Sequence, residues 1–115
     1  MQPKFNIWIE ENDKVVLSPW RVRLLETIER TGSISAAAVE LNLPYRRAWE
    51  KVQEMEVGLG VALLNTSIGG AGGGGAQLTE AGHRIIDQFH AFMDGFEEQL
   101  AERFQTVFEV NTQGE

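Results

Sequence analysis

Residues 32–52 have the sequence GSISAAAVELNLPYRRAWEKV, and this stretch decides the fold. Gly32 can end one helix, and the hydroxyl of Ser33 can cap the next by accepting a free backbone N–H. Asn42-Leu43-Pro44 then predicts a turn, because proline disfavours a helical residue before it and suits a first helical position. The sequence therefore predicts a short helix, a tight turn and a second helix from Pro44 to about Met55.

The two predicted helices each have one apolar face. In the first helix this face holds Ile34, Ala37, Ala38 and Leu41, and the small alanines allow another helix to approach closely. In the second helix the apolar stripe is Tyr45, Ala48, Trp49, Val52 and Met55, whereas Arg46, Arg47, Glu50 and Lys51 point away from it. This pattern is typical of a helix-turn-helix that presents cations to a DNA major groove. It is also compatible with a helical hairpin whose outer face is merely solvated.

The residues before this stretch predict a β-hairpin and one more helix. Phe5, Ile7 and Ile9 alternate with mainly polar residues, which is the period of a strand with one buried face. Residues 11–14 favour a turn, and residues 15–17 can return as the partner strand. We therefore expect a hairpin over 1–17. Ser18 and Pro19 are typical of a helix start, so a helix precedes the helix-turn-helix, which extends the helical region over 18–55.

A glycine-rich loop follows the second helix. An apolar run at 61–64 predicts a strand, residues 69–75 contain six glycines, and Gln77-Leu78 can resume extended structure before Thr79 caps a helix. Strand, loop and strand over 61–79 after a helix-turn-helix is the pattern of a wing. The loop also matches the G-x-G-x-x-G pattern of dinucleotide-binding proteins. That interpretation is disfavoured, because no helix opens at the last glycine and no second parallel strand follows.

Residues 80–107 predict one long helix. Its apolar residues recur at intervals of three and four, and a helix of this length would extend beyond a domain of this size. We therefore expect its apolar stripe to pack against a second copy of the chain, with residues 108–115 as a polar tail. The predicted dimerisation residues are Ile86, Phe89, Met93, Phe96, Leu100 and Phe104.

Composition limits the remaining possibilities. The 115 residues predict a single domain, and the formal net charge of −7 is concentrated in residues 80–115, which hold two Arg and eight acidic residues. The absence of cysteine fits a cytoplasmic protein, and no apolar run predicts a membrane span. His83, Asp87 and His90 have helical spacing, but a metal site needs three or four converging ligands. We expect no metal, no cofactor and no enzymatic activity, because no catalytic constellation is evident.

The chain resembles the N-terminal DNA-binding domain of the molybdate-responsive, ModE-type regulators, which are related to the LysR-type winged helices. The resemblance covers roughly residues 18–105 and is carried by the motifs GSISAA at 32–37, Tyr45 with Ala48-Trp49, GGAGGGGA at 69–76, and LTEAG at 78–82. It implies a homodimer that places two recognition helices in successive major grooves. The family's molybdate-binding half has no counterpart in these residues, so we expect no direct molybdate binding here. Pro44 replaces a small hydroxyl residue, and Thr66 and Ala71 stand where the family is expected to carry a basic side chain.

The sequence thus predicts an α+β fold, mainly α, in the form of a winged helix-turn-helix. The predicted function is that of a dimeric, sequence-specific transcriptional regulator that binds double-stranded DNA, in molybdenum or related metal homeostasis. An alternative is an interaction module that dimerises with a full-length regulator and tunes it. The predicted DNA-binding residues are Ser33, Ser35, Pro44, Tyr45, Arg46, Arg47, Lys51, Gly72, Gly73 and Gly74.

Overall fold

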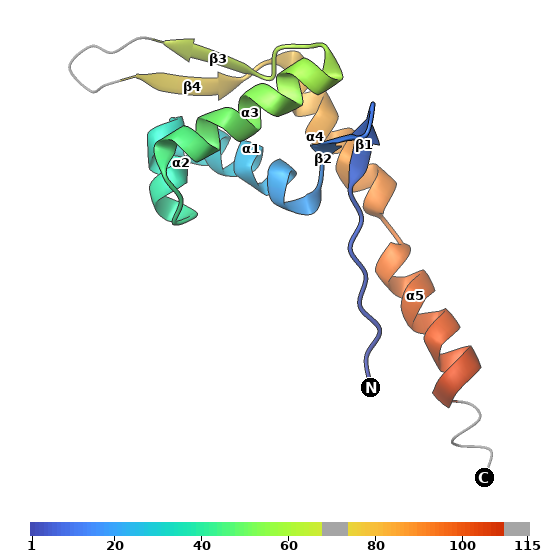
Figure 1. The fold of residues 1–115 in the computed structure, drawn as a ribbon. Coiled ribbons are helices and arrows are strands. Elements are labelled where there is room, and N and C mark those ends of the chain that lie inside the picture. The colour runs from blue at the N-terminus through green and yellow to red at the C-terminus, as the bar shows by residue number, and fades with distance from the viewer. Residues whose placement is uncertain (68–73, 110–115) are drawn as a thin grey trace.

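The fold is described by a computed structural model, which defines residues 1–67 and 74–109 (Figure 1). The mainly helical winged helix-turn-helix predicted from the sequence is confirmed. The elements, in chain order, are β1 (Ile9–Glu11), β2 (Lys14–Leu17), α1 (Pro19–Thr31), α2 (Ile34–Glu40), α3 (Tyr45–Leu59), β3 (Leu64–Ser67), β4 (Gly75–Leu78), α4 (Glu80–Met93), α5 (Phe96–Phe104) and a short π-helical turn, η1 (Gln105–Glu109).

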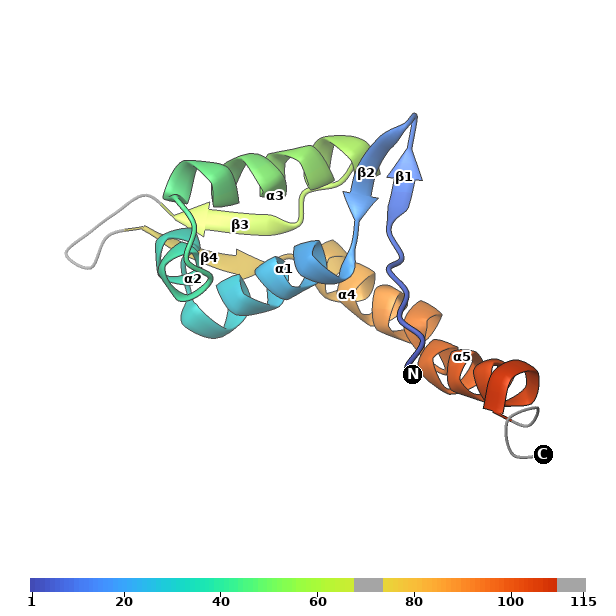
Figure 2. The same cartoon turned by 60° about the horizontal axis from the view of Figure 1, so that its bottom comes forward.

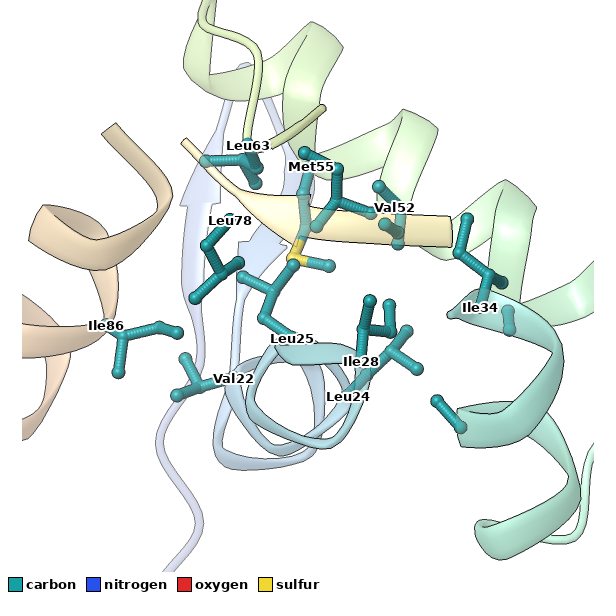
Figure 3. Close-up of a cluster of buried hydrophobic side chains, with 14 of the residues drawn as sticks. Val22, Leu24, Leu25, Ile28, Ile34, Val52, Met55, Leu63, Leu78 and Ile86 are labelled. Carbon is teal, nitrogen blue, oxygen red and sulfur yellow. The ribbon is translucent and has the colours of Figure 1, made fainter. Parts of the chain in front are cut away.

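Helix α1 lies at the centre of the hydrophobic core. Leu24, Leu25 and Ile28 are completely buried, and α1 packs against α2, α3, α4 and β4 (Figure 3). Met55 of α3 and Leu63, just before β3, close the core on the side opposite α1 and are also completely buried. A single buried cluster therefore joins the helix-turn-helix, the wing and α4, and it fixes their relative positions.

The helix boundaries follow the capping signals in the sequence. The side chains of Ser18, Ser33 and Thr79 each accept a hydrogen bond from a backbone N–H in the first turn of the helix that they cap. Gly32 ends α1 with a φ of +88°, a conformation that glycine adopts without steric cost. Between α2 and α3, Asn42 adopts a φ of +58°, which asparagine tolerates better than most residues. The predicted tight turn is confirmed.

Both hairpins differ from their predictions: the N-terminal hairpin is shorter than predicted, and the first strand of the wing begins later. Strand β1 covers Ile9–Glu11 only, so Phe5 and Ile7 precede the sheet, and Asn12 and Asp13 form its turn with φ values of +53° and +65°. β3 begins at Leu64 instead of residue 61. A physical reason is that the Glu56 carboxylate accepts the backbone N–H groups of Leu63 and Leu64, which holds this segment to the end of α3. β3 and β4 pair antiparallel in register, Leu64 opposite Leu78.

The predicted continuous helix over 80–107 is wrong in two respects: it is interrupted near Gly95, and its last residues, from Gln105, belong to η1. The helix ends at Met93, Gly95 takes a φ of +87°, and α5 begins at Phe96. Asp94 adopts an extended conformation as the C-cap of α4, so the hydrogen-bond ladder stops there. Figure 2 shows α5 continuing away from the core in roughly the direction of α4, with the N-terminal segment beside their junction. The C-terminal region is therefore long and helical but consists of two separate helices.

Candidate nucleic-acid interface

Helix α3 is held by a narrower apolar stripe than the sequence predicts. Ala48, Val52 and Met55 are buried, whereas Tyr45 and Trp49 are 52% and 45% exposed. Tyr45 and Trp49 lie at the edge of the stripe, where the side chains extend past the contact with the neighbouring helices. The predicted apolar stripe is therefore buried only at Ala48, Val52 and Met55. Both aromatic side chains lie instead on the surface of the candidate recognition helix, which makes Trp49 an additional candidate for DNA contact.

The three predicted cations of α3 have different environments. The Arg46 side chain is 89% exposed, with its Nε 3.6 Å from an oxygen of Glu50, and Lys51 Nζ is 3.6 Å from Glu54. Arg47 is exposed, and none of the carboxylates that the structure describes lies within ion-pair distance of it. Arg47 is thus the unpaired cation of α3 within the described structure.

Glu54 joins α3 to the start of α1. The Arg21 guanidinium donates a 2.8 Å hydrogen bond to Glu54, and the Arg21 side chain is only 10% exposed. This hydrogen bond, together with the nearby Lys51 charge, lowers the pKa of Glu54 even though partial burial acts in the opposite direction. Glu54 is therefore ionised near neutral pH and shared between two cations. Sequence reasoning missed Arg21, because its position on α1 carries no pattern that predicts a contact with α3.

The predicted site residues of α2 and of the turn that follows it differ in role. Ser33 is the N-cap of α2, and its hydroxyl oxygen already accepts the Ala36 N–H at 3.0 Å. Ser35 is exposed on the first turn of α2. Pro44 is the N-cap of α3 with a ψ of 144°, so the prediction that it is the first helical residue is off by one. Ser35 and Pro44 are thus both exposed, Ser35 at the start of α2 and Pro44 just before α3.

The wing is fixed to the helix-turn-helix through the outer edge of β4. The backbone N–H groups of Ala76 and Leu78 face away from β3, and each donates a 2.8 Å hydrogen bond to the end of α1, to the Gly32 carbonyl and the Glu29 carboxylate respectively. These two bonds satisfy an edge that would otherwise be unpaired. Glu29 was not predicted from the sequence, since its partner is far along the chain. Gly74 is exposed beside β4, and the predicted contacts Gly72 and Gly73 lie outside the described residues.

The predicted dimerisation residues fall into two groups. Ile86 and Phe89 are buried in the core of the same chain, and Met93 packs partly against it, so the prediction that Ile86 and Phe89 form a free dimer surface is wrong. They face α1, which the sequence pattern of residues 80–107 does not reveal. The second group, Phe96, Leu100 and Phe104, lies on α5, which has no buried residue.

An apolar groove lies between α5 and the N-terminal segment. It has a volume of about 660 Å³, and its apolar lining comes from Phe5, Ile7, Phe96 and Leu100. The Phe96 ring packs edge-on against both Phe5 and Phe92, with centroid separations of 6.3 and 5.4 Å. The N-terminal segment and the C-terminal helices thus form one partly apolar surface at the end of the molecule opposite the wing (Figure 1).

The two histidines of α4 face carboxylates of α1. Nε2 of His90 is 2.9 Å from Glu26, and Nε2 of His83 is 3.5 Å from Glu29. Within residues 1–67 and 74–109 there is no cluster of three or more metal-ligating side chains. None of the helices in this part of the chain is long and apolar enough to cross a membrane.

The geometry defines a winged helix-turn-helix, and sequence comparison identifies its family. Residues 20–83 match the bacterial regulatory helix-turn-helix family of the LysR type. The chain belongs to this family of DNA-binding transcriptional regulators.

The chain is also similar to longer proteins, two of which have molybdenum in their names. It is 46% identical over 81 residues to the molybdenum-pterin-binding protein MopB of Rhodobacter capsulatus, covering 70% of this chain and 30% of that protein. It is 39% identical to the molybdenum transport protein ModE of Azotobacter vinelandii, covering 79% and 35% of the two chains. It is 33% identical to the DNA-binding transcriptional dual regulator ModE of Escherichia coli, covering 96% and 39%. The chain spans about a third of the length of these relatives.

Solved structures show the same fold at lower identity. The oxidised form of OxyR from Corynebacterium glutamicum superposes with a TM-score of 0.54 at 23% identity, over 73% of this chain and 26% of that one. Full-length LysG from the same organism, with bound effector Arg, gives a TM-score of 0.56 at 20% identity, over 79% and 30% of the two chains. These similarities support the winged helix-turn-helix architecture.

Proposed function

We propose that this chain is the sequence-specific DNA-binding unit of a dimeric regulator in molybdenum homeostasis. The observation that carries the proposal is the surface of α3, where the unpaired cation Arg47, the exposed Arg46 and the half-exposed rings of Tyr45 and Trp49 lie on one recognition helix. Arginine recognises guanine edges or phosphates, and aromatic or methyl-bearing surfaces contact thymine methyl groups. The molybdenum role rests on the names of the similar proteins alone.

In this proposal each element of the interface has its own task. Helix α3 enters a major groove, Ser35 and the turn at Pro44 contact the backbone beside it, and the wing approaches the neighbouring phosphates. The hydrogen bonds from β4 to Gly32 and Glu29 keep the wing at a fixed position relative to the turn. Dimerisation through α5 and the N-terminal segment would place two such units on two half-sites.

The test is a selection from random duplexes followed by salt titration of the enriched sequence. We expect enrichment of a sequence with two half-sites, with affinity that falls as salt rises because bound phosphates release counterions. Arg47→Ala should cost about 1–3 kcal/mol if Arg47 recognises a guanine, with relaxed preference at one position. Arg84→Ala on α4, which also removes one exposed positive charge, is the matched control. No enrichment at low salt would refute the proposal.

Dimerisation is tested separately by sedimentation. Phe96→Glu places a charge in the apolar surface shared with Phe5 and Phe92, and we expect it to convert the dimer to a monomer. Glu98→Gln on the same helix is the control for altered charge. A folded wild-type monomer at micromolar concentration would contradict dimerisation and leave DNA binding to be judged by the selection.

A second candidate function is an interaction module that pairs with a full-length regulator. The observation in its favour is electrostatic: the net charge is −7, and two of the three α3 cations are paired with glutamates. It predicts dimerisation without sequence enrichment, so the same selection separates the two candidates.

A further inference from the structure

Two of the three glutamates of α3, Glu50 and Glu54, lie on the same side of the helix as its cations, which the proposed function assigns to DNA. Glu50 follows Arg46 by one helical turn, and Glu54 follows Glu50 by another, so the carboxylates alternate with the cations along the exposed side. A helix that only needed to attract phosphate would gain nothing from these two negative charges. Their position therefore needs a separate explanation.

The two glutamates are in different environments. Glu54 is bonded to the buried Arg21 and has a structural task, since it joins α3 to α1. Glu50 is about half exposed, and the 3.6 Å ion pair with Arg46 is its sole polar contact among the described residues. No packing requirement within the described structure accounts for a carboxylate at position 50.

We propose that Glu50 limits the DNA affinity of the recognition helix by holding Arg46 on the helix surface, which leaves Arg47 as the cation that meets the duplex first. This inference rests on the proposed DNA-binding function. A phosphate that binds Arg46 competes with Glu50 for the guanidinium, and the carboxylate itself repels the phosphates nearby. Sequence-independent attraction is thereby weakened, so binding depends more on the contacts that Arg47 and the exposed rings make with bases.

The test measures dissociation constants of wild type and Glu50→Gln for a labelled duplex of random sequence at several salt concentrations. Glutamine keeps the size and polarity of the side chain but removes the charge. We expect tighter binding by about 1.5-fold to fivefold, the range that an exposed ion pair is worth in an equilibrium. We also expect the salt slope to steepen by up to about 0.9, because Arg46 becomes free to neutralise a phosphate.

Two controls define the mechanism. Glu98→Gln removes one negative charge from the exposed surface of α5, far from α3. It should leave the dissociation constant and the salt slope unchanged. In the Arg46→Ala background, Glu50→Gln should give a smaller gain in affinity, because only the repulsion of phosphates by Glu50 is then removed and no cation is released. Thermal unfolding of each variant checks that the fold is kept.

Each outcome decides the proposal. If wild type binds the duplex and Glu50→Gln binds it no more tightly, this inference is overturned and the proposed function stands. An equal gain for Glu98→Gln shows an effect of overall charge and also overturns it, as does a full gain in the Arg46→Ala background. If neither wild type nor any variant binds duplex DNA at low salt, the proposed function fails, and this inference fails with it.

Discussion

The region around α1 and the region around α5 differ in how their apolar side chains are used. Helix α1 contributes four buried apolar residues to a core that α2, α3, α4 and the wing share. Helix α5 contributes none, although Phe96, Leu100 and Phe104 lie along it. The winged helix-turn-helix is therefore fixed by its own chain. The α5 half carries apolar surface that fits contact with another molecule.

The largest expected effect contrasts one phenylalanine from each region. Phe89→Ala removes a side chain that is 4% exposed in the core and should cost about 3–5 kcal/mol of unfolding free energy at any protein concentration. Phe104→Ala removes a partly exposed ring and should cost about 1 kcal/mol or less at low concentration. Urea unfolding at two protein concentrations measures both. Equal losses at low concentration would contradict the difference between the regions.

The next contrast uses two glycines, one in each region. A Cβ at Gly82 would lie 2.5 Å from the Leu63 carbonyl oxygen at the base of the wing, so Gly82→Ala must displace α4 or β3. We expect a loss of about 1–3 kcal/mol. Gly95 has open space around it but a φ of +87°, so Gly95→Ala should cost about 1 kcal/mol from backbone strain alone. Thermal unfolding measures the loss of stability in both variants. A larger loss for Gly95→Ala than for Gly82→Ala would refute the expectation that the close contact at Gly82 costs more than the positive φ at Gly95.

A smaller effect is expected where the wing meets α1. Glu29→Ala removes the acceptor of the Leu78 N–H, and we expect a loss of about 1 kcal/mol with faster amide exchange at Leu78. Glu29→Gln should restore much of the protection, because the amide oxygen can accept the same bond. Glu26→Ala is the matched control, since Glu26 lies on the same helix and faces His90 instead. Unchanged exchange at Leu78 in Glu29→Ala would show that the wing is held by other contacts.

The sequence predicted the winged helix-turn-helix well, because the sequence signals for its helices are local. Capping by Ser18, Ser33 and Thr79 depends on residues within one turn, and the buried faces of α1 and α2 follow helical spacing. The wing was predicted from its glycines, although the strand began three residues later than expected. That shift depends on Glu56, whose long-range bond to Leu63 has no sequence pattern.

The sequence predicted the α5 half less well, because periodicity does not identify the partner of an apolar stripe. Ile86 and Phe104 belong to the same pattern, yet one is buried in the chain's own core and the other is not. The break at Gly95 was also missed, since the stripe continues across it. In the candidate site, the cations of α3 were predicted, but the pairing of Lys51 with Glu54, and of Glu54 with Arg21, required the three-dimensional arrangement.

The smallest expected effect is the pH dependence of the stability that the Arg21–Glu54 ion pair contributes. The hydrogen bond from Arg21 lowers the pKa of Glu54 below its ordinary value near 4.5. Because the pKa is lower in the folded state, the stabilisation is fully present above pH 4.5 and is lost as the pH falls through the lower, folded value. The Glu54 side chain is 49% exposed, so solvent screening limits this contribution to about 1 kcal/mol or less.

Urea unfolding of wild type and Glu54→Gln across the acid range measures this contribution. Glutamine can still accept a hydrogen bond from Arg21 but does not titrate, so the stability of the variant should fall less steeply with acid than that of wild type. Glu98→Gln on α5, which removes a carboxylate that makes no ion pair among the described residues, should follow the wild-type curve. Parallel curves for wild type and Glu54→Gln would show that the charge of Glu54 does not contribute to holding α3 to α1.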